Sequence, residues 1–158
     1  MPTQDWIMLA LGLFYGGMLL WLAWLDARYF WLPDRLTLPL LGCGLAANLS
    51  GLGPVGTTDA LAGAMGGGAA LWAVAWGYKR WRGIDGLGGG DPKLFAAIGA
   101  WTGWHELPLI LLTASLIGLL FIALRWLRGD KVHGRQRLPL GTLLALAAWP
   151  VWVMICWG

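Results

Sequence analysis

Two acidic residues lie where a carboxylate is energetically expensive. Asp26 ends an uncharged apolar run over Trp6–Leu25, and Asp91 follows a run of glycines and opens a short apolar segment. An ionisable group at membrane depth is a candidate functional group. Each also has an ordinary structural interpretation, Asp26 as a solvated helix end beside an arginine and Asp91 as an N-cap before a proline. Two carboxylates on one membrane face would form an aspartyl dyad, in which one activates water and the other protonates a leaving amine.

Other residues that could do chemistry do not fit a known pattern. Gly86–Asp91 fails the dinucleotide-binding pattern because Asp91 stands at its last position, and the phosphate-loop pattern because Lys93 follows a proline. The two histidines lack metalloprotease spacing, and Cys43 and Cys156 lie inside apolar runs, where they pack as small hydrophobes. We therefore expect no metal site and no cofactor. The glycines before Asp91 supply backbone freedom beside the carboxylate.

The composition indicates which elements must position these groups. Of 158 residues, 58% are hydrophobic and 12% charged, against about 45–50% and about 25% in soluble domains. This argues against a soluble monomer and a disordered chain, and continuous apolar runs argue against a β-barrel. The length fits one domain, residues 1–158. We predict an all-α, polytopic membrane protein of about six transmembrane helices, over Trp6–Leu25, Leu36 to about Leu52, Ala60–Tyr78, Leu94–Trp104, Pro108–Leu124 and Leu138–Trp157.

The positive charges predict the orientation. All eleven Lys and Arg residues fall in the connectors after the first, third and fifth predicted helices. By the positive-inside rule these connectors are cytoplasmic and both termini are extracytoplasmic. The fourth predicted helix covers only about 17 Å of a hydrocarbon core about 30 Å thick, so part of the glycine-rich loop before it must sit at membrane depth. Asp26 and Asp91 are therefore expected on the same, cytoplasmic face.

Two segments together resemble a known family. The first runs from Leu25 to Pro39 and contains Asp26 and, eight positions later, the Leu-Pro-Asp motif that ends at Asp34. The second runs from Gly88 to Trp104 and contains a GxGDxKL pattern, whose fixed positions are Gly88, Gly90, Asp91, Lys93 and Leu94. In this order, on the cytoplasmic side of six predicted helices, they resemble the bacterial type IV prepilin peptidases, which are polytopic GxGD aspartic proteases.

The resemblance implies roles for these residues. Asp26 and Asp91 would be the catalytic pair. Asp34 would be a structural or supporting motif residue, and Lys93 would influence the charge of Asp91 or reach lipid headgroups. The segment Leu138–Thr142 departs from the Pro-Phe-Gly-Pro usual in the family, and we assign it no role.

The resemblance also implies a function. The expected activity removes the leader peptide of type IV prepilins or type II secretion pseudopilins at the bacterial inner membrane. The substrate helix and membrane lipid would be the partners, without nucleic acid. Larger family members add an N-terminal segment with zinc-binding CxxC pairs and a methyltransferase activity. This chain begins at its first predicted helix without CxxC, so we predict cleavage without zinc and without methyl transfer.

Two other classes of function remain as alternatives. A membrane transporter or channel subunit predicts polar residues along the helix centres and often an inverted repeat, whereas the predicted helices here are nearly pure hydrocarbon with glycine and tryptophan. A noncatalytic membrane scaffold explains the hydrophobicity but not two acidic motifs. The sequence names neither the individual substrate nor the oligomeric state.

Overall fold

The computed structural model describes residues 3–83, 88–128 and 139–158. These residues form helices and no strand, which confirms the predicted all-helical class, and each predicted apolar run corresponds to one helix. The helices are α1 (Thr3–Tyr29), α2 (Asp34–Leu49), α3 (Thr57–Arg82), α4 (Asp91–Thr102), α5 (Leu107–Leu127) and α6 (Leu140–Trp157).

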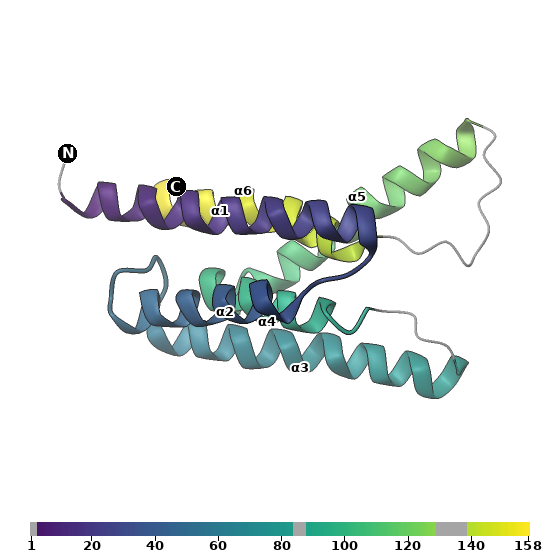
Figure 1. Cartoon of the computed structure of the whole chain (residues 1–158), viewed down its shortest axis with the longest axis horizontal. Helices are drawn as coiled ribbons and strands as arrows, with labels where there is room; N and C mark the ends of the chain where they lie inside the picture. The colour runs from purple at the N-terminus through teal and green to yellow at the C-terminus, as the bar shows by residue number, and fades with distance from the viewer. Residues whose placement is uncertain (1–2, 84–87, 129–138) are drawn as a thin grey trace.

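The helices lie in two layers, with α5 running obliquely from one to the other (Figure 1). One layer contains α1 and α6, which lie side by side and antiparallel, and the other contains α2, α3 and α4. The start of α1 and the end of α6 lie at one end of the bundle. The end of α1 and the starts of α4 and α6 lie at the opposite end, so Asp26 and Asp91 come to the same end of the molecule.

The shortest helix, α4, is also the most enclosed. Ten of its twelve residues are buried, and it contacts α2, α3, α5 and α6. Its approach to α3 is close because Gly63 and Gly99 face each other, and a Cβ atom on either would collide with the backbone of the other. Small residues allow such close packing of membrane helices. A helix too short to cross a bilayer can therefore begin inside the protein, where other helices shield its backbone from lipid.

Aromatic side chains join the two layers. Trp101 of α4 donates its Nε1–H to the Leu40 carbonyl of α2 at 2.9 Å. The same ring stacks on Tyr15 of α1, with 4.9 Å between ring centroids, and Trp152 of α6 packs against both rings. This cluster holds α4 in place relative to α1 and α6, and with it the start of α4 relative to the end of α1.

Four helices, α1, α3, α5 and α6, are long and apolar enough to cross a membrane. Their surfaces carry large apolar side chains, and in α5 the exposed ones include Leu112, Leu116, Leu119 and Leu120. The chain is therefore a multi-pass membrane protein. The other two helices are shorter, 16 residues in α2 and 12 in α4. The predicted all-α, polytopic class is confirmed, with six helices in the described residues, of which four are long enough to span a membrane. The crossing of the membrane by all six helices and the side on which the termini lie stay predictions.

Candidate active site

Asp26 lies in the last turns of α1, and its residue is only 5% exposed. Its Oδ2 accepts a hydrogen bond from the backbone N–H of Thr142 at 2.7 Å and lies 3.2 Å from the Thr142 hydroxyl. Thr142 belongs to the first turn of α6, where backbone N–H groups have no partner within the helix. Glycine at position 141 leaves room for this approach, because a Cβ there would lie 3.0 Å from Oδ2 of Asp26. The interpretation of Asp26 as a solvated helix end is therefore wrong.

Asp91 is the first residue of α4 and is likewise 5% exposed. The N-cap of α4 is Gly90, and no side chain caps the helix. The Asp91 carboxylate instead turns back and accepts a hydrogen bond from the Gly88 N–H, with 3.0 Å between nitrogen and Oδ2. The interpretation of Asp91 as an ordinary N-cap is therefore wrong, and its carboxylate is buried at the junction of the glycine-rich segment and α4.

Leu32, in the connector between α1 and α2, lies close to a neighbouring residue of each aspartate. It is 7% exposed. A Cβ on Gly90 would lie 2.5 Å from the Leu32 Cβ, and a Cβ on Gly141 would lie 2.9 Å from its Cδ1. The residue before Asp91 and the residue beside Asp26 thus both contact one side chain, which shows that the two predicted site segments meet.

The electrostatics of Asp91 also reflect this convergence. Asp91 lies outside the four helices that are long enough to cross a membrane. Burial and, after it, the negative charge of Asp26 raise the pKa of Asp91 to about 6, while the hydrogen bond from the Gly88 N–H opposes the rise. Near neutral pH, two carboxyl groups in this arrangement can hold one base and one acid, which is the chemistry of general acid–base hydrolysis.

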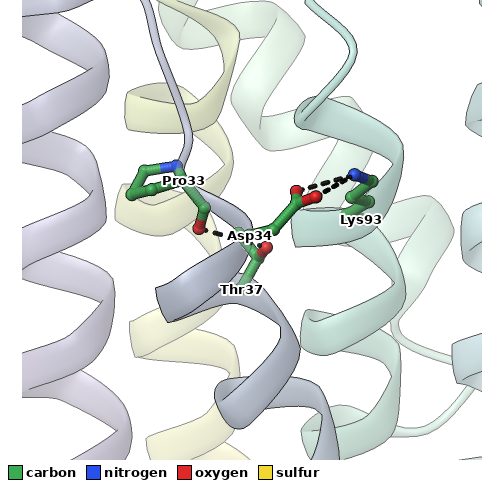
Figure 2. A network of polar contacts seen from close by, with 4 residues as sticks. All are labelled: Pro33, Asp34, Thr37 and Lys93. Atoms are coloured by element: carbon green, nitrogen blue, oxygen red, sulfur yellow. Dashed lines mark hydrogen bonds and ion pairs between the residues drawn. The ribbon is translucent and has the colours of Figure 1, made fainter.

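Asp34 and Lys93 form an ion pair that connects the two motifs (Figure 2). Lys93 Nζ donates to Asp34 Oδ1 at 2.6 Å and to Oδ2 at 2.7 Å. Asp34 starts α2, and Lys93 lies in the first turn of α4. The two side chains are 54% and 45% exposed, so this pair is at the surface, unlike Asp26 and Asp91. Lys93 therefore pairs with Asp34 in this structure, a contact that the sequence interpretation did not predict.

A cavity of about 530 Å³ lies beside the ion pair. It opens between the connector after α1 and the segment before α4, and both predicted motifs contribute to its walls. Its lining residues are Trp31, Leu32, Pro33, Asp34, Arg35, Gly89, Gly90 and Lys93. Leu32, which lines the cavity, also contacts Gly141, the residue beside Asp26.

The sequence interpretation missed Gly141 and Thr142, which were assigned no role. The only available indication was their place: they open the last apolar run directly after a basic connector, on the face predicted for Asp26. Asp85 and the basic segment 129–138 lie outside the described residues. In the part of the chain that the structure describes, no three His, Cys, Asp or Glu side chains come together as a metal site.

Comparison with known proteins identifies relatives along most of the chain. The model of the type IV leader peptidase family matches residues 13–123. A prepilin leader peptidase/N-methyltransferase of Aeromonas salmonicida is 44% identical over 157 residues, 99% of this chain and 52% of the relative. Proteins of the same name from Aeromonas hydrophila (45%, covering 87% of this chain and 46% of the relative) and Pseudomonas aeruginosa (41%, covering 90% and 50%) are also similar. The chain spans about half the length of these relatives. No solved structure matches it.

Proposed function

The chain belongs to the type IV leader peptidase family, and on this premise we propose that it is a membrane-embedded aspartic endopeptidase. Its proposed substrates are type IV prepilins or type II secretion pseudopilins, from which it removes the leader peptide. The names of its relatives support a prepilin substrate. The observation in the molecule that carries the proposal is the pair of carboxyl groups, Asp26 and Asp91, both 5% exposed at one end of the bundle with the charge of one acting on the other.

The surroundings of the two carboxyl groups support different roles for them. Asp26 has two donors at Thr142, the backbone N–H and the hydroxyl, whereas among the described residues Asp91 has a hydrogen bond from the Gly88 N–H. Donated hydrogen bonds favour the ionised carboxylate, and the second donor favours it more at Asp26. We assign Asp26 as the base, which takes a proton from water as the water oxygen attacks the scissile carbonyl carbon. Asp91, whose pKa is about 6, is the acid that gives its proton to the leaving amine as the C–N bond breaks. The products are a free carboxyl group and a free amine.

The cleavage is proposed to occur at the cytoplasmic face of the bacterial inner membrane. The positive charges of the sequence all lie in the odd-numbered connectors, which the positive-inside rule assigns to the cytoplasm. The end of α1, which carries Asp26, and the start of α4, which carries Asp91, lie at the same end of the bundle, and this proposal assigns that end to the cytoplasm. Residues 1–158 form one transmembrane unit in this proposal, with the apolar helix of the substrate and the surrounding lipid as its partners.

The test of the dyad is cleavage of a prepilin by the protein in proteoliposomes, followed by mass spectrometry of the product. Asp26→Asn and Asp91→Asn each keep the size of the side chain but remove its acid–base chemistry, so each reduces cleavage to background. The double variant is no worse than either single one, because the two groups act as a unit. Asp34→Asn leaves measurable cleavage because its side chain is half exposed and pairs with Lys93.

Two outcomes would contradict this assignment. Cleavage by Asp91→Asn at the wild-type rate refutes the aspartyl mechanism. If Asp34→Asn loses cleavage as completely as Asp26→Asn at equal expression, the catalytic pair contains Asp34, the other aspartate of the first motif. The mass of the product also reports whether a methyl group has been added to the new N-terminus.

The orientation is tested by labelling single cysteines with a membrane-impermeant thiol reagent in intact cells, after replacement of Cys43 and Cys156. Arg80→Cys and Arg128→Cys are expected to be shielded, and Leu52→Cys and His105→Cys to react; all four positions are exposed at the protein surface. Labelling at position 80 from outside would reverse the orientation and remove the cytoplasmic cleavage site from the proposal.

A further inference from the structure

Thr142 makes three polar contacts with the last turns of α1. Its backbone N–H donates to Oδ2 of Asp26 at 2.7 Å, and its hydroxyl lies 3.2 Å from the same oxygen. The hydroxyl also lies 2.9 Å from the Ala23 carbonyl oxygen, to which it can donate. The two residues of the Asp26–Thr142 contact are 116 positions apart in the sequence, so the contact exists only because α6 packs beside α1.

The two donor groups of Thr142 differ in what they can do. The backbone N–H only donates, and a donated hydrogen bond stabilises the ionised form of a carboxyl group. The hydroxyl has one proton to donate and lone pairs to accept with. It can donate to an ionised Asp26, or it can donate to the Ala23 carbonyl and accept a hydrogen bond from a protonated Asp26. Thr142 can therefore bond to Asp26 in both protonation states.

We propose that Thr142 is a positioning residue for the aspartyl reaction. Its N–H holds Oδ2 of Asp26 and favours the carboxylate that activates water, and its hydroxyl keeps the side chain in place after Asp26 has taken up the proton. A group held in both states needs no reorientation during the reaction, and groups oriented in advance lower the barrier. This inference rests on the function proposed above and adds a residue to that site.

Within residues 3–83, 88–128 and 139–158, few other charged groups face Asp26, so an effect of Thr142 on its protonation is separable. From α4 the facing group is Asp91, and Lys93 of the same helix is paired with Asp34 of α2. Arg35 of α2 lines the neighbouring cavity. On α1 itself, the guanidinium of Arg28 lies over the ring of Trp24, 5.9 Å from its centroid. Helix α6, from Leu140 to Trp157, contains no Asp, Glu, Lys, Arg or His.

Three substitutions at this position separate the two donors. Thr142→Val keeps the backbone N–H and the shape of the side chain but removes the hydroxyl. Thr142→Ser keeps both donors. Thr142→Pro removes both, at a position in the first turn of a helix where proline is tolerated. The matched control is Thr113→Val in α5, because the Thr113 hydroxyl donates only to backbone carbonyls of its own helix, Leu109 at 2.9 Å and Ile110 at 3.0 Å.

The first readout is the pH–rate profile of prepilin cleavage. For Thr142→Val we expect kcat about tenfold lower with an unchanged KM, and an acid limb about one pH unit higher, because the ionised carboxylate has lost a donor. Thr142→Ser recovers most of the rate and the wild-type acid limb, and Thr142→Pro loses more than Thr142→Val. Thr113→Val leaves the profile unchanged. A Thr142→Val profile that coincides with that of the wild type overturns the inference.

The second readout is independent of cleavage and keeps the two proposals distinguishable. The thermal unfolding midpoint of Thr142→Val in detergent is compared with that of the wild type between pH 4 and pH 8. Because a hydrogen bond to a charged group is stronger than one to a neutral group, the deficit of the variant shrinks as the pH falls and Asp26 takes up a proton. A pH-independent deficit means that Thr142 acts through packing and overturns the inference. If the deficit of Thr142→Val depends on pH but the wild-type protein does not cleave prepilins, the proposed function is overturned. The coupling between Thr142 and Asp26 then still stands.

Discussion

Replacement of Asp91 by asparagine is expected to abolish cleavage and at the same time to stabilise the folded protein. Asp91 is almost completely buried, and the negative charge of Asp26 acts on it. The ionised form of Asp91 is therefore unfavourable in the folded state. An asparagine carries no charge, yet its side-chain oxygen can still accept the hydrogen bond from the Gly88 N–H. The substitution therefore removes the unfavourable charge and keeps the local contact.

The size of this effect follows from the pKa of Asp91. A pKa raised from 3.8 to about 6 corresponds to about 3 kcal/mol of differential stability. Because the pKa of the folded state is the higher one, the wild type has this stability below pH 3.8 and loses it as the pH rises through about 6. The asparagine variant does not titrate at this position. Its advantage over the wild type is therefore small at pH 4, grows between pH 4 and pH 6, and reaches at most about 3 kcal/mol above pH 7.

The assay is equilibrium unfolding in mixed detergent micelles, monitored by tryptophan fluorescence at pH 4, 6 and 8. Asp34→Asn is the matched control, because it removes a carboxylate from a half-exposed ion pair with Lys93 and should change the free energy of unfolding by no more than about 1 kcal/mol. An Asp91→Asn variant that is less stable than the wild type at pH 8, or equally displaced from it at all three pH values, would refute the reasoning that burial and the neighbouring carboxylate dominate at this position.

Three further results are expected. Cleavage by the wild type should fall about tenfold per pH unit on the alkaline side of about pH 6, because the acid form of Asp91 is depleted there; a flat rate between pH 6 and pH 8 would contradict its assignment as the acid. Lys93→Met should lower kcat only modestly, as measured in the same proteoliposome assay, since its ion pair with Asp34 is at the surface. Gly63→Ala should destabilise the protein by about 1–3 kcal/mol, because its new methyl group meets the backbone of α4, whereas Gly66→Ala, which has open space around it, should be neutral or stabilising by thermal unfolding.

Local patterns in the sequence predicted the helices well, because hydrophobicity over about 20 residues is a property of the segment itself. They also selected Asp26 and Asp91 as the unusual acidic residues, since each interrupts or borders an apolar run. The starts of α2 and α4 differ from the predicted ones by two and three residues, Asp34 instead of Leu36 and Asp91 instead of Leu94. These differences arise because polar residues can occupy the first turn of a helix without adding to its hydrophobicity.

The sequence by itself determined that this chain crosses a membrane and carries two acidic motifs beside apolar segments. Only the tertiary structure decided which acidic residues are buried: Asp26 and Asp91 are 5% exposed, whereas Asp34 reaches the surface and pairs with Lys93, 59 positions away. It also brought Thr142 to Asp26. Such contacts depend on which helices pack together and how closely glycines allow them to approach, and no pattern within a single segment encodes that choice.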